Sequence, residues 1–129
     1  MPKSEHLIQD EVRQAVSAQC PGVIFRTNAG QAYAGDKIWS PEYRQEILIN
    51  LRPYKGLPKG FADTVYFGPE ADTVFLEIKN SQGKTSPEQE RFLALMKKFG
   101  HSAAVVRSAE EAVQYINDSK RRRYNNAES

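Results

Sequence analysis

The segment Thr73–Asn80 carries an acid and a base at a spacing that lets both address one ligand. Its alternating apolar residues predict a strand, and successive side chains of a strand point to opposite faces. Glu77 and Lys79 are two residues apart and therefore share one face, together with Phe75. A solvated strand face with a weak ion pair is the competing interpretation of this pair.

A second acid, Asp63, opens the strand expected just before this one. If the two strands pair through the turn at Gly68-Pro69, Asp63 comes near Glu77. Two neighbouring carboxylates repel each other unless a cation lies between them. Oxygen ligands of this type suit Mg²⁺ or Mn²⁺, and such an ion polarises a phosphate and lowers the pKa of a bound water. A lysine alongside, here Lys79, can position the water or neutralise developing charge, so the set favours phosphoryl chemistry.

The elements that position these residues follow from periodicity and from turn residues. The second helix is the best marked, because Ser86 is a typical N-cap, Pro87 suits the first helical position and Gln89 completes a capping box. The expected helices and strands are, in chain order, Ser4–Gln19 (helix), Val23–Thr27, Glu46–Leu51, Asp63–Phe67 and Thr73–Asn80 (strands), 87–99 (helix), Ala103–Val106 (strand) and 109–116 (helix).

This order, α-β-β-β-β-α-β-α, predicts an α/β fold with a mixed central sheet flanked by helices. Asn28–Ser40 and Pro53–Gly60 are rich in turn-forming or small residues and are expected to be loops. The strand Glu46–Leu51 is expected to be partly buried on both faces. We predict one domain over residues 1–119 and a basic, flexible tail over 120–129 that contains the run Lys120-Arg-Arg-Arg123.

Composition is that of an ordinary globular domain, with 129 residues, 40% hydrophobic residues and 26% charged residues. The net charge of +2 does not by itself indicate nucleic-acid binding. The single cysteine, Cys20, excludes an internal disulfide, fits a reducing compartment and is expected to be buried. No apolar stretch approaches the ~20 residues needed to span a bilayer, so we expect a cytoplasmic protein with no membrane partner.

Three ordered motifs carry a family resemblance: Gly60-Phe-Ala-Asp63, Glu77-Ile-Lys79 and Ser86-Pro-Glu-Gln89. Together they resemble the PD-(D/E)xK nuclease superfamily, and more closely its VRR-NUC (virus-type replication-repair nuclease) branch. Further residues fit that branch, namely Glu5 with Gln9, Arg26-Thr-Asn28-Ala-Gly30 and Val105-Val-Arg-Ser108. The resemblance runs from Glu5 to about Ile116 and is to the stand-alone type, not to the multidomain Fanconi-anaemia-associated nucleases. Ala62 departs from the family, in which many members have proline before the aspartate.

The resemblance implies a role for each site residue. Asp63 and Glu77 would bind Mg²⁺ or Mn²⁺ together with the main-chain carbonyl of Ile78, and Lys79 would be the catalytic lysine. Glu5 would approach from the first helix as a further acid. Its alternative role is a first-turn carboxylate that favours the helix dipole, and Glu11 is its competitor.

Gln89 would point into the site from the second helix, although its capping box explains it equally well. Arg26 and Asn28 are candidates for gripping phosphate, with turn geometry as the alternative for Asn28. Lys55 and Lys59, with Arg52, flank the loop before Asp63 and could follow a DNA backbone; a solvated loop is the competing interpretation.

The resemblance also implies an activity and partners. The chain would be an endonuclease that hydrolyses DNA phosphodiester bonds, in a bacterial or phage-infected cell. Stand-alone relatives imply a homodimer that acts on branched DNA such as Holliday junctions, and the aromatic-containing segment Gln31–Arg52 is the candidate dimer contact. Two alternatives remain open, a catalytically silent DNA-binding or repair-assembly module and a small-molecule phosphohydrolase.

Overall fold

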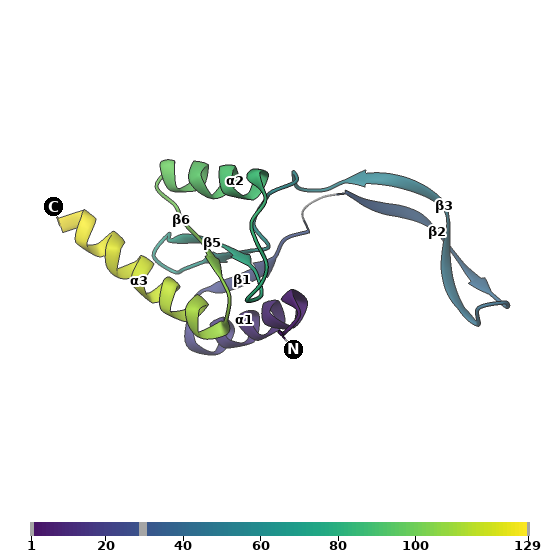
Figure 1. The fold of residues 1–129 in the computed structure, drawn as a ribbon, viewed down its shortest axis with the longest axis horizontal. Coiled ribbons are helices and arrows are strands. Elements are labelled where there is room, and N and C mark those ends of the chain that lie inside the picture. The colour runs from purple at the N-terminus through teal and green to yellow at the C-terminus, as the bar shows by residue number, and fades with distance from the viewer. Residues whose placement is uncertain (1, 29–30, 129) are drawn as a thin grey trace.

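The computed structural model describes residues 2–28 and 31–128. Its elements, shown in Figure 1, are α1 (Glu5–Gln19), β1 (Val23–Arg26), β2 (Gln31–Ser40), β3 (Gln45–Lys55), β4 (Thr64–Phe67), β5 (Thr73–Ile78), α2 (Pro87–Lys98), β6 (Ser102–Val106) and α3 (Ala109–Glu128). No helix in this part of the chain is long and apolar enough to cross a membrane.

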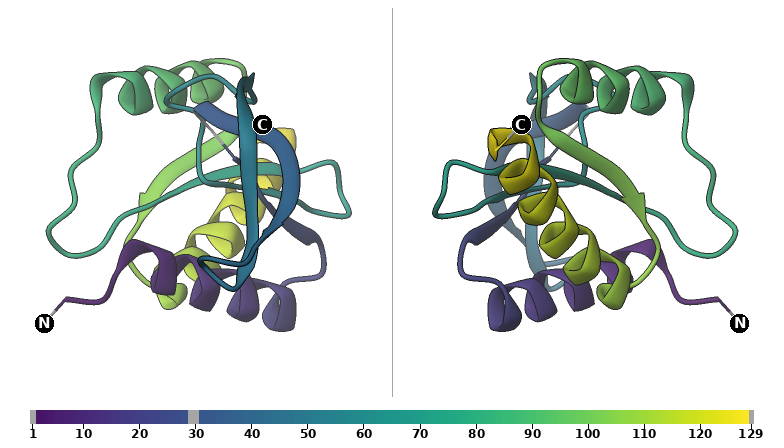
Figure 2. Two further views of the ribbon diagram at one scale, coloured as in Figure 1. Left: turned by 90° about the vertical axis from the view of Figure 1, so that its right-hand side faces the viewer. Right: turned by 90° about the vertical axis from the view of Figure 1, so that its left-hand side faces the viewer.

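A four-stranded mixed sheet in the order β1-β4-β5-β6 forms the centre of the domain, which confirms the predicted fold class. The pairs β1/β4 and β4/β5 are antiparallel, and β5/β6 is parallel. A parallel pair needs a crossover connection, and α2 supplies it. In Figures 1 and 2, α2 covers one face of the sheet, whereas α1 and α3 lie on the other.

The two faces of β5 enter two separate apolar clusters, as its alternation predicts. Leu76 is fully buried among residues of α1 and α3, including Val12 and Ile116. Phe75 points to the opposite side and packs with Leu93 of α2. The side chain of Glu77 shares the α2 side of the sheet with Phe75, because the two are separated by two positions.

The helix ends obey the capping rules on which their prediction rested. Ser4 accepts a hydrogen bond from Leu7 N at 3.1 Å and begins α1. Ser86 and Gln89 form the reciprocal capping box at the start of α2. Gly100, with a φ of 93°, follows α2 and allows the chain to turn back toward β6.

The segment Gln31–Ser40 is a strand, and the prediction of a loop there was wrong. It pairs antiparallel with β3, which is longer than expected and extends into the predicted loop Pro53–Gly60. The β-branched and aromatic residues of β2 favour a strand once a partner strand is present, whatever its glycine and alanine content. The element order therefore contains one strand more than predicted.

We call Gln31–Lys55, which comprises β2, β3 and their turn, the arm. The arm projects from the domain (Figure 1), and neither of its strands packs against another helix or strand of the described chain. The expectation that Glu46–Leu51 is partly buried on both faces was therefore wrong. Of that segment only Ile47 is half-buried, whereas Leu48 and Leu51 are 48% and 56% exposed.

Other boundaries differ by one or two residues, except at the C-terminus. The helix α3 continues past the expected end at Ile116 as far as Glu128. Lysine and arginine are good helix formers, so the polar composition that suggested fraying does not stop the helix. The side chains of the basic run at 120–123 lie outside the described residues.

Candidate active site

Strand pairing brings the two predicted acids together at one end of the sheet. In the β4/β5 ladder Thr64 lies opposite Leu76, so the residues just beyond them, Asp63 and Glu77, are neighbours across the pair. Asp63 Oδ2 accepts a hydrogen bond from Ile78 N at 2.8 Å. The turn between the strands therefore places Asp63 against the chain directly after Glu77, as the sequence predicts.

The backbone of Asp63 is fixed from the other side by the end of β1. Thr27 N donates to Asp63 O at 2.9 Å, and the Thr27 hydroxyl donates to the carbonyl of Ala62. Gly60 is required three residues earlier, because it has a φ of 93° and an added Cβ would lie 2.7 Å from the carbonyl of Glu88. The Gly-Phe-Ala-Asp motif is thus a tight approach of the chain to the start of α2.

Glu77 is a buried carboxyl group, not part of a solvated strand face. The residue is 1% exposed. Its Oε1 accepts a hydrogen bond from Gln89 Nε2 at 2.8 Å and lies 3.8 Å from Lys79 Nζ. Its Oε2 is buried with no hydrogen-bond partner in the described protein. A buried charged oxygen without a partner is costly, so the site favours either a proton or a cation at this atom.

The electrostatics of the site favour the protonated form of Glu77 when no ion is bound. Burial and, second to it, the neighbouring negative charge of Asp63 raise the pKa of Glu77 to about 8. The ammonium of Lys79 opposes this rise by lowering the same pKa. Adding a divalent cation would reverse the balance, because it supplies the positive charge that the two carboxylates lack.

The oxygen atoms of Asp63 and Glu77 suit a hard divalent cation that needs few protein ligands. Within the described residues, no group of three or more His, Cys, Asp or Glu side chains is arranged to hold a metal ion. Two carboxylates are nevertheless what Mg²⁺ commonly takes from a protein, with water and phosphate oxygens completing its shell. Asp63 and Glu77 therefore fit such an ion, with the main-chain oxygen of Ile78 available by sequence position.

Lys79 is held beside the acids with little freedom. Its side chain is 12% exposed, and its backbone N–H donates to Val106 O at 3.1 Å, which continues the β5/β6 ladder beyond β5. An ammonium held in place this way costs little reorganisation when charge develops nearby.

Gln89 makes a capping contact and also points toward the candidate site. Its Oε1 accepts a hydrogen bond from Ser86 N at 2.8 Å in the capping box, while its Nε2 donates to Glu77. One amide therefore closes the N-terminus of α2 and orients the buried carboxyl group.

Glu5 reaches the site from the first turn of α1, and Glu11 does not. A Cβ added to Gly83 would lie 2.8 Å from Glu5 Oε2 and 3.2 Å from Lys79 Cδ, so Glu5 and Lys79 both pack against this glycine. Glu11 instead forms an exposed ion pair with Lys3 at 2.9 Å. The structure thus supports Glu5 over its competitor as the acid that approaches Lys79.

The loop that follows Lys79 is held by Arg107, a contact that the sequence did not predict. Arg107 Nη1 donates to Asn80 O at 2.5 Å and to Gly83 O at 2.8 Å, so one guanidinium ties both ends of the turn. Asn80 Oδ1 accepts from Gly83 N at 2.8 Å inside it. The only indication in the sequence was the family-like segment Val105–Ser108. The contact of Arg107 with this turn could not be predicted, because it joins distant positions in the chain.

The candidate phosphate-binding residues are distributed unevenly. Arg26 and Asn28 are exposed and flank Thr27, which bonds to Asp63, so they border the site. Lys59 is exposed in the loop that packs on the start of α2. The side chain of Lys55 lies outside the described residues. Arg52 lies away on the arm, 3.5 Å from Asp36.

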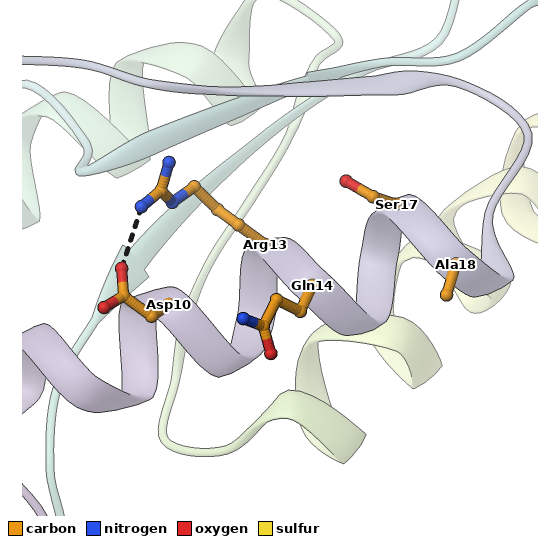
Figure 3. Close-up of a pocket in the computed structure, with 5 residues that line it drawn as sticks. All are labelled: Asp10, Arg13, Gln14, Ser17 and Ala18. Atoms are coloured by element: carbon orange, nitrogen blue, oxygen red, sulfur yellow. Dashed lines mark hydrogen bonds and ion pairs between the residues drawn. The ribbon is translucent and has the colours of Figure 1, made fainter.

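A shallow cavity of about 630 Å³ lies elsewhere, along α1 (Figure 3). Asp10, Arg13 and Ser17 are among its lining residues, and Asp10 pairs with Arg13 at 2.8 Å. None of the candidate site residues lines this cavity. We therefore assign it no part in the chemistry.

A mixed sheet that presents paired carboxylates and a lysine at the end of its central strands has the architecture of a nuclease-type domain. The chain belongs to the VRR-NUC domain family, whose sequence profile matches residues 3–110. It is also similar in fold to a solved structure described as "VRR_NUC domain", with a TM-score of 0.51 and 19% identity over 89% of this chain and 97% of the other. No curated protein matches the sequence closely.

Proposed function

We propose that this VRR-NUC protein is a metal-dependent endonuclease that hydrolyses DNA phosphodiester bonds. The observation that carries the proposal is the state of Glu77 beside Asp63. Glu77 is 1% exposed, and one of its carboxyl oxygens has no hydrogen-bond partner among the described residues. Burying an acid against a second acid is unfavourable for the fold alone. The arrangement becomes favourable when a divalent cation binds between them.

In this proposal each side chain has a separate task. Asp63 and Glu77 hold Mg²⁺ or Mn²⁺, with the Ile78 carbonyl as a further ligand, and the ion supplies Lewis-acid polarisation of the phosphate. Gln89 keeps Glu77 oriented through its hydrogen bond. Lys79 faces the reacting phosphate, where its ammonium neutralises developing charge or positions water.

Glu5 is the remaining acid of the proposed site. It packs against Gly83 beside Lys79, which supports a role in orienting that ammonium or an ion-bound water. Arg26, Asn28 and Lys59 are the proposed phosphate contacts, because they are exposed around the same end of the sheet. Lys55 is a fourth candidate by its place in the sequence.

We further propose that the active species is a homodimer with a preference for branched DNA such as Holliday junctions. Two copies double the phosphate contacts of a domain whose net charge is only +2. A two-fold axis also places two cutting sites at a fixed separation. The exposed apolar residues of the arm, among them Trp39 at 62%, support the segment Gln31–Arg52 as the contact.

The deciding experiment is cleavage of labelled four-way junction, linear duplex, flap and single-stranded DNA in Mg²⁺, in Mn²⁺ and in EDTA. The proposal expects cleavage that EDTA abolishes and that Asp63→Ala and Glu77→Ala both lose. Glu110→Ala, an exposed acid on α3, is the matched control and should cut normally. DNA binding without cleavage by the wild type under every condition would favour the silent DNA-binding module. Equal rates on duplex and junction would remove only the preference for branched DNA.

A further inference from the structure

We propose that Lys84 binds a phosphate of the DNA strand close to the phosphate that is cut, and that the turn Asn80–Gly83 holds Lys84 in place for this contact. This assigns Lys84 to substrate binding and not to the chemistry. The inference rests on the proposed function in one respect, that the substrate is DNA. It adds a contact to the exposed residues already proposed around the site.

Lys84 is an exposed cation that no acid of the fold neutralises. Within the described residues its side chain takes part in no hydrogen bond or ion pair. Other exposed lysines of the chain are paired, Lys3 with Glu11 at 2.9 Å and Lys37 with Glu46 at 3.1 Å. The positive charge of Lys84 is therefore available to a ligand.

The position of Lys84 along the chain is unfavourable for a cation in the fold alone. Lys84 lies two residues before Ser86, the N-cap of α2. The N-terminus of a helix is the positive end of its dipole and favours negative charge. Lys97 and Lys98, in contrast, lie in the last turn of α2, where the dipole favours a cation. Helix stability therefore explains those two lysines and does not explain Lys84.

The turn before Lys84 is fixed by hydrogen bonds. Asn80 Oδ1 accepts from Gln82 N at 3.1 Å and from Gly83 N at 2.8 Å. Arg107 Nη1 donates to Gly83 O at 2.8 Å, and this carbonyl directly precedes Lys84. The main chain at Lys84 is therefore already ordered, so binding a phosphate there costs little additional ordering of the backbone.

Gly83 places Lys84 beside the candidate active site. A Cβ added to Gly83 would lie 2.8 Å from Glu5 Oε2 and 3.2 Å from Lys79 Cδ. Consecutive Cα atoms are about 3.8 Å apart, so Lys84 follows directly on a residue that packs against two site residues. The loop between β5 and α2 projects from the side of the domain that carries the N-terminus (Figure 2). A DNA strand that reaches Lys79 therefore passes within reach of the Lys84 side chain.

The charges of the site explain why a further cation is needed. Asp63, Glu77 and Glu5 bring three acids to it, and Lys79 Nζ already lies 3.8 Å from Glu77 Oε1. Acids repel an approaching phosphate, and the whole chain has a net charge of only +2. Contacts of lysine with backbone phosphates supply affinity and position the strand without reading its sequence. An unpaired lysine next to the acids meets this need.

The test measures DNA binding in EDTA by fluorescence anisotropy, with labelled duplex and labelled four-way junction, so that no strand is cut. We expect Lys84→Ala to weaken binding about tenfold at about 50 mM salt and about threefold at about 200 mM, because loss of one phosphate contact changes the salt slope by roughly 0.9. Lys84→Arg keeps the charge and should bind like the wild type. Lys98→Ala is the matched control, because Lys98 is also exposed but lies at the other end of α2.

Kinetics and modified DNA separate a binding contact from a catalytic one. Lys84→Ala should raise KM and leave kcat unchanged, because a phosphate contact of equal strength in the ground state and the transition state affects binding alone. Single neutral methylphosphonates, scanned along one strand, locate the contact. Neutralising the phosphate that Lys84 binds should weaken binding by the wild type and have no further effect in Lys84→Ala.

The outcomes distinguish the contact from the nuclease proposal. Wild-type affinity and salt slope in Lys84→Ala would overturn the contact, and the nuclease proposal would stand if the wild type cuts DNA. Methylphosphonate effects that add to Lys84→Ala at every position would overturn the contact, as would a fall in kcat with KM unchanged or a wild type that binds no DNA. Binding that depends on Lys84 in a protein that cuts no DNA would count against the nuclease proposal alone.

Discussion

Metal binding should become weaker as the pH falls from 8 to 6, because a proton competes for Glu77. Burial and the charge of Asp63 raise the pKa of this carboxyl to about 8. About half of the molecules would then be ionised at pH 8 and about 1% at pH 6, since ionisation falls tenfold for each pH unit below the pKa. A ligand that must lose this proton to bind an ion gives an apparent Mg²⁺ affinity that drops roughly fiftyfold over that range.

The same shift fixes the sign of the pH dependence of stability. The pKa of Glu77 in the ion-free fold lies above its ordinary value of 4.5, so the fold binds this proton more tightly than the unfolded chain does. Its contribution to stability is therefore complete below pH 4.5 and is lost as the pH rises through about 8. Bound Mg²⁺ should oppose that loss, because it stabilises the ionised form.

Isothermal titration calorimetry of Mg²⁺ at pH 6, 7 and 8, in buffers of different ionisation enthalpy, measures both the affinity and the protons released. We expect release of nearly one proton per ion at pH 7 and about half that at pH 8. Glu77→Gln is the control, because it removes the titrating group and the proton release together. An affinity that is constant from pH 6 to 8, with no proton released by the wild type, would refute the reasoning.

The remaining predictions concern the division of labour in the site. Asp63→Ala and Glu77→Ala should each slow cleavage by roughly a thousandfold in a quenched time course, because a catalytic ion contributes several kcal/mol to transition-state stabilisation. Gel shifts should show that both variants still bind DNA. Lys79→Ala should slow cleavage about a hundredfold or more yet keep Mg²⁺ binding by calorimetry; loss of the ion in a folded variant would contradict this. Gly83→Ala should lower kcat with little change in KM, up to about a hundredfold, because its Cβ displaces Glu5 and Lys79. Arg107→Ala should likewise lower kcat and speed amide exchange of the loop after Lys79; an effect on KM and its salt dependence alone would instead indicate a phosphate contact.

The parts of the fold that local rules determine could be predicted from sequence. The capping box at Ser86 needs only neighbouring residues. The alternation along Thr73–Ile78 assigns its side chains to the two covered faces of β5, and Glu77 lies on the same face as Phe75. The meeting of Asp63 and Glu77 required one further step, the antiparallel pairing of their strands. A short turn makes that pairing nearly obligatory, so it was predictable as well.

The arm was not predictable in the same way. The glycines and alanines of Gln31–Ser40 indicate a loop when they are considered alone, and only pairing with β3 makes the segment a strand. The burial of β3 was also mispredicted. Alternating apolar residues predict a buried strand face, but they do not indicate whether the same chain covers that face. The contacts of Arg107 with Asn80 and Gly83 were out of reach for a related reason, since they join segments more than twenty positions apart.

The hydrogen bonds of Gln89 explain why one motif served both the fold and the site. Its carbonyl oxygen closes the capping box with Ser86, and this bond fixes the amide so that its nitrogen is aimed at Glu77. The N-terminus of α2 in turn sits where Gly60 allows the chain before Asp63 to pass against Glu88. The helix start, the turn before the first acid and the buried second acid are therefore one connected network. Motifs that look like ordinary capping and turn signals thus place the two carboxylates relative to each other, which is what binding a single cation requires.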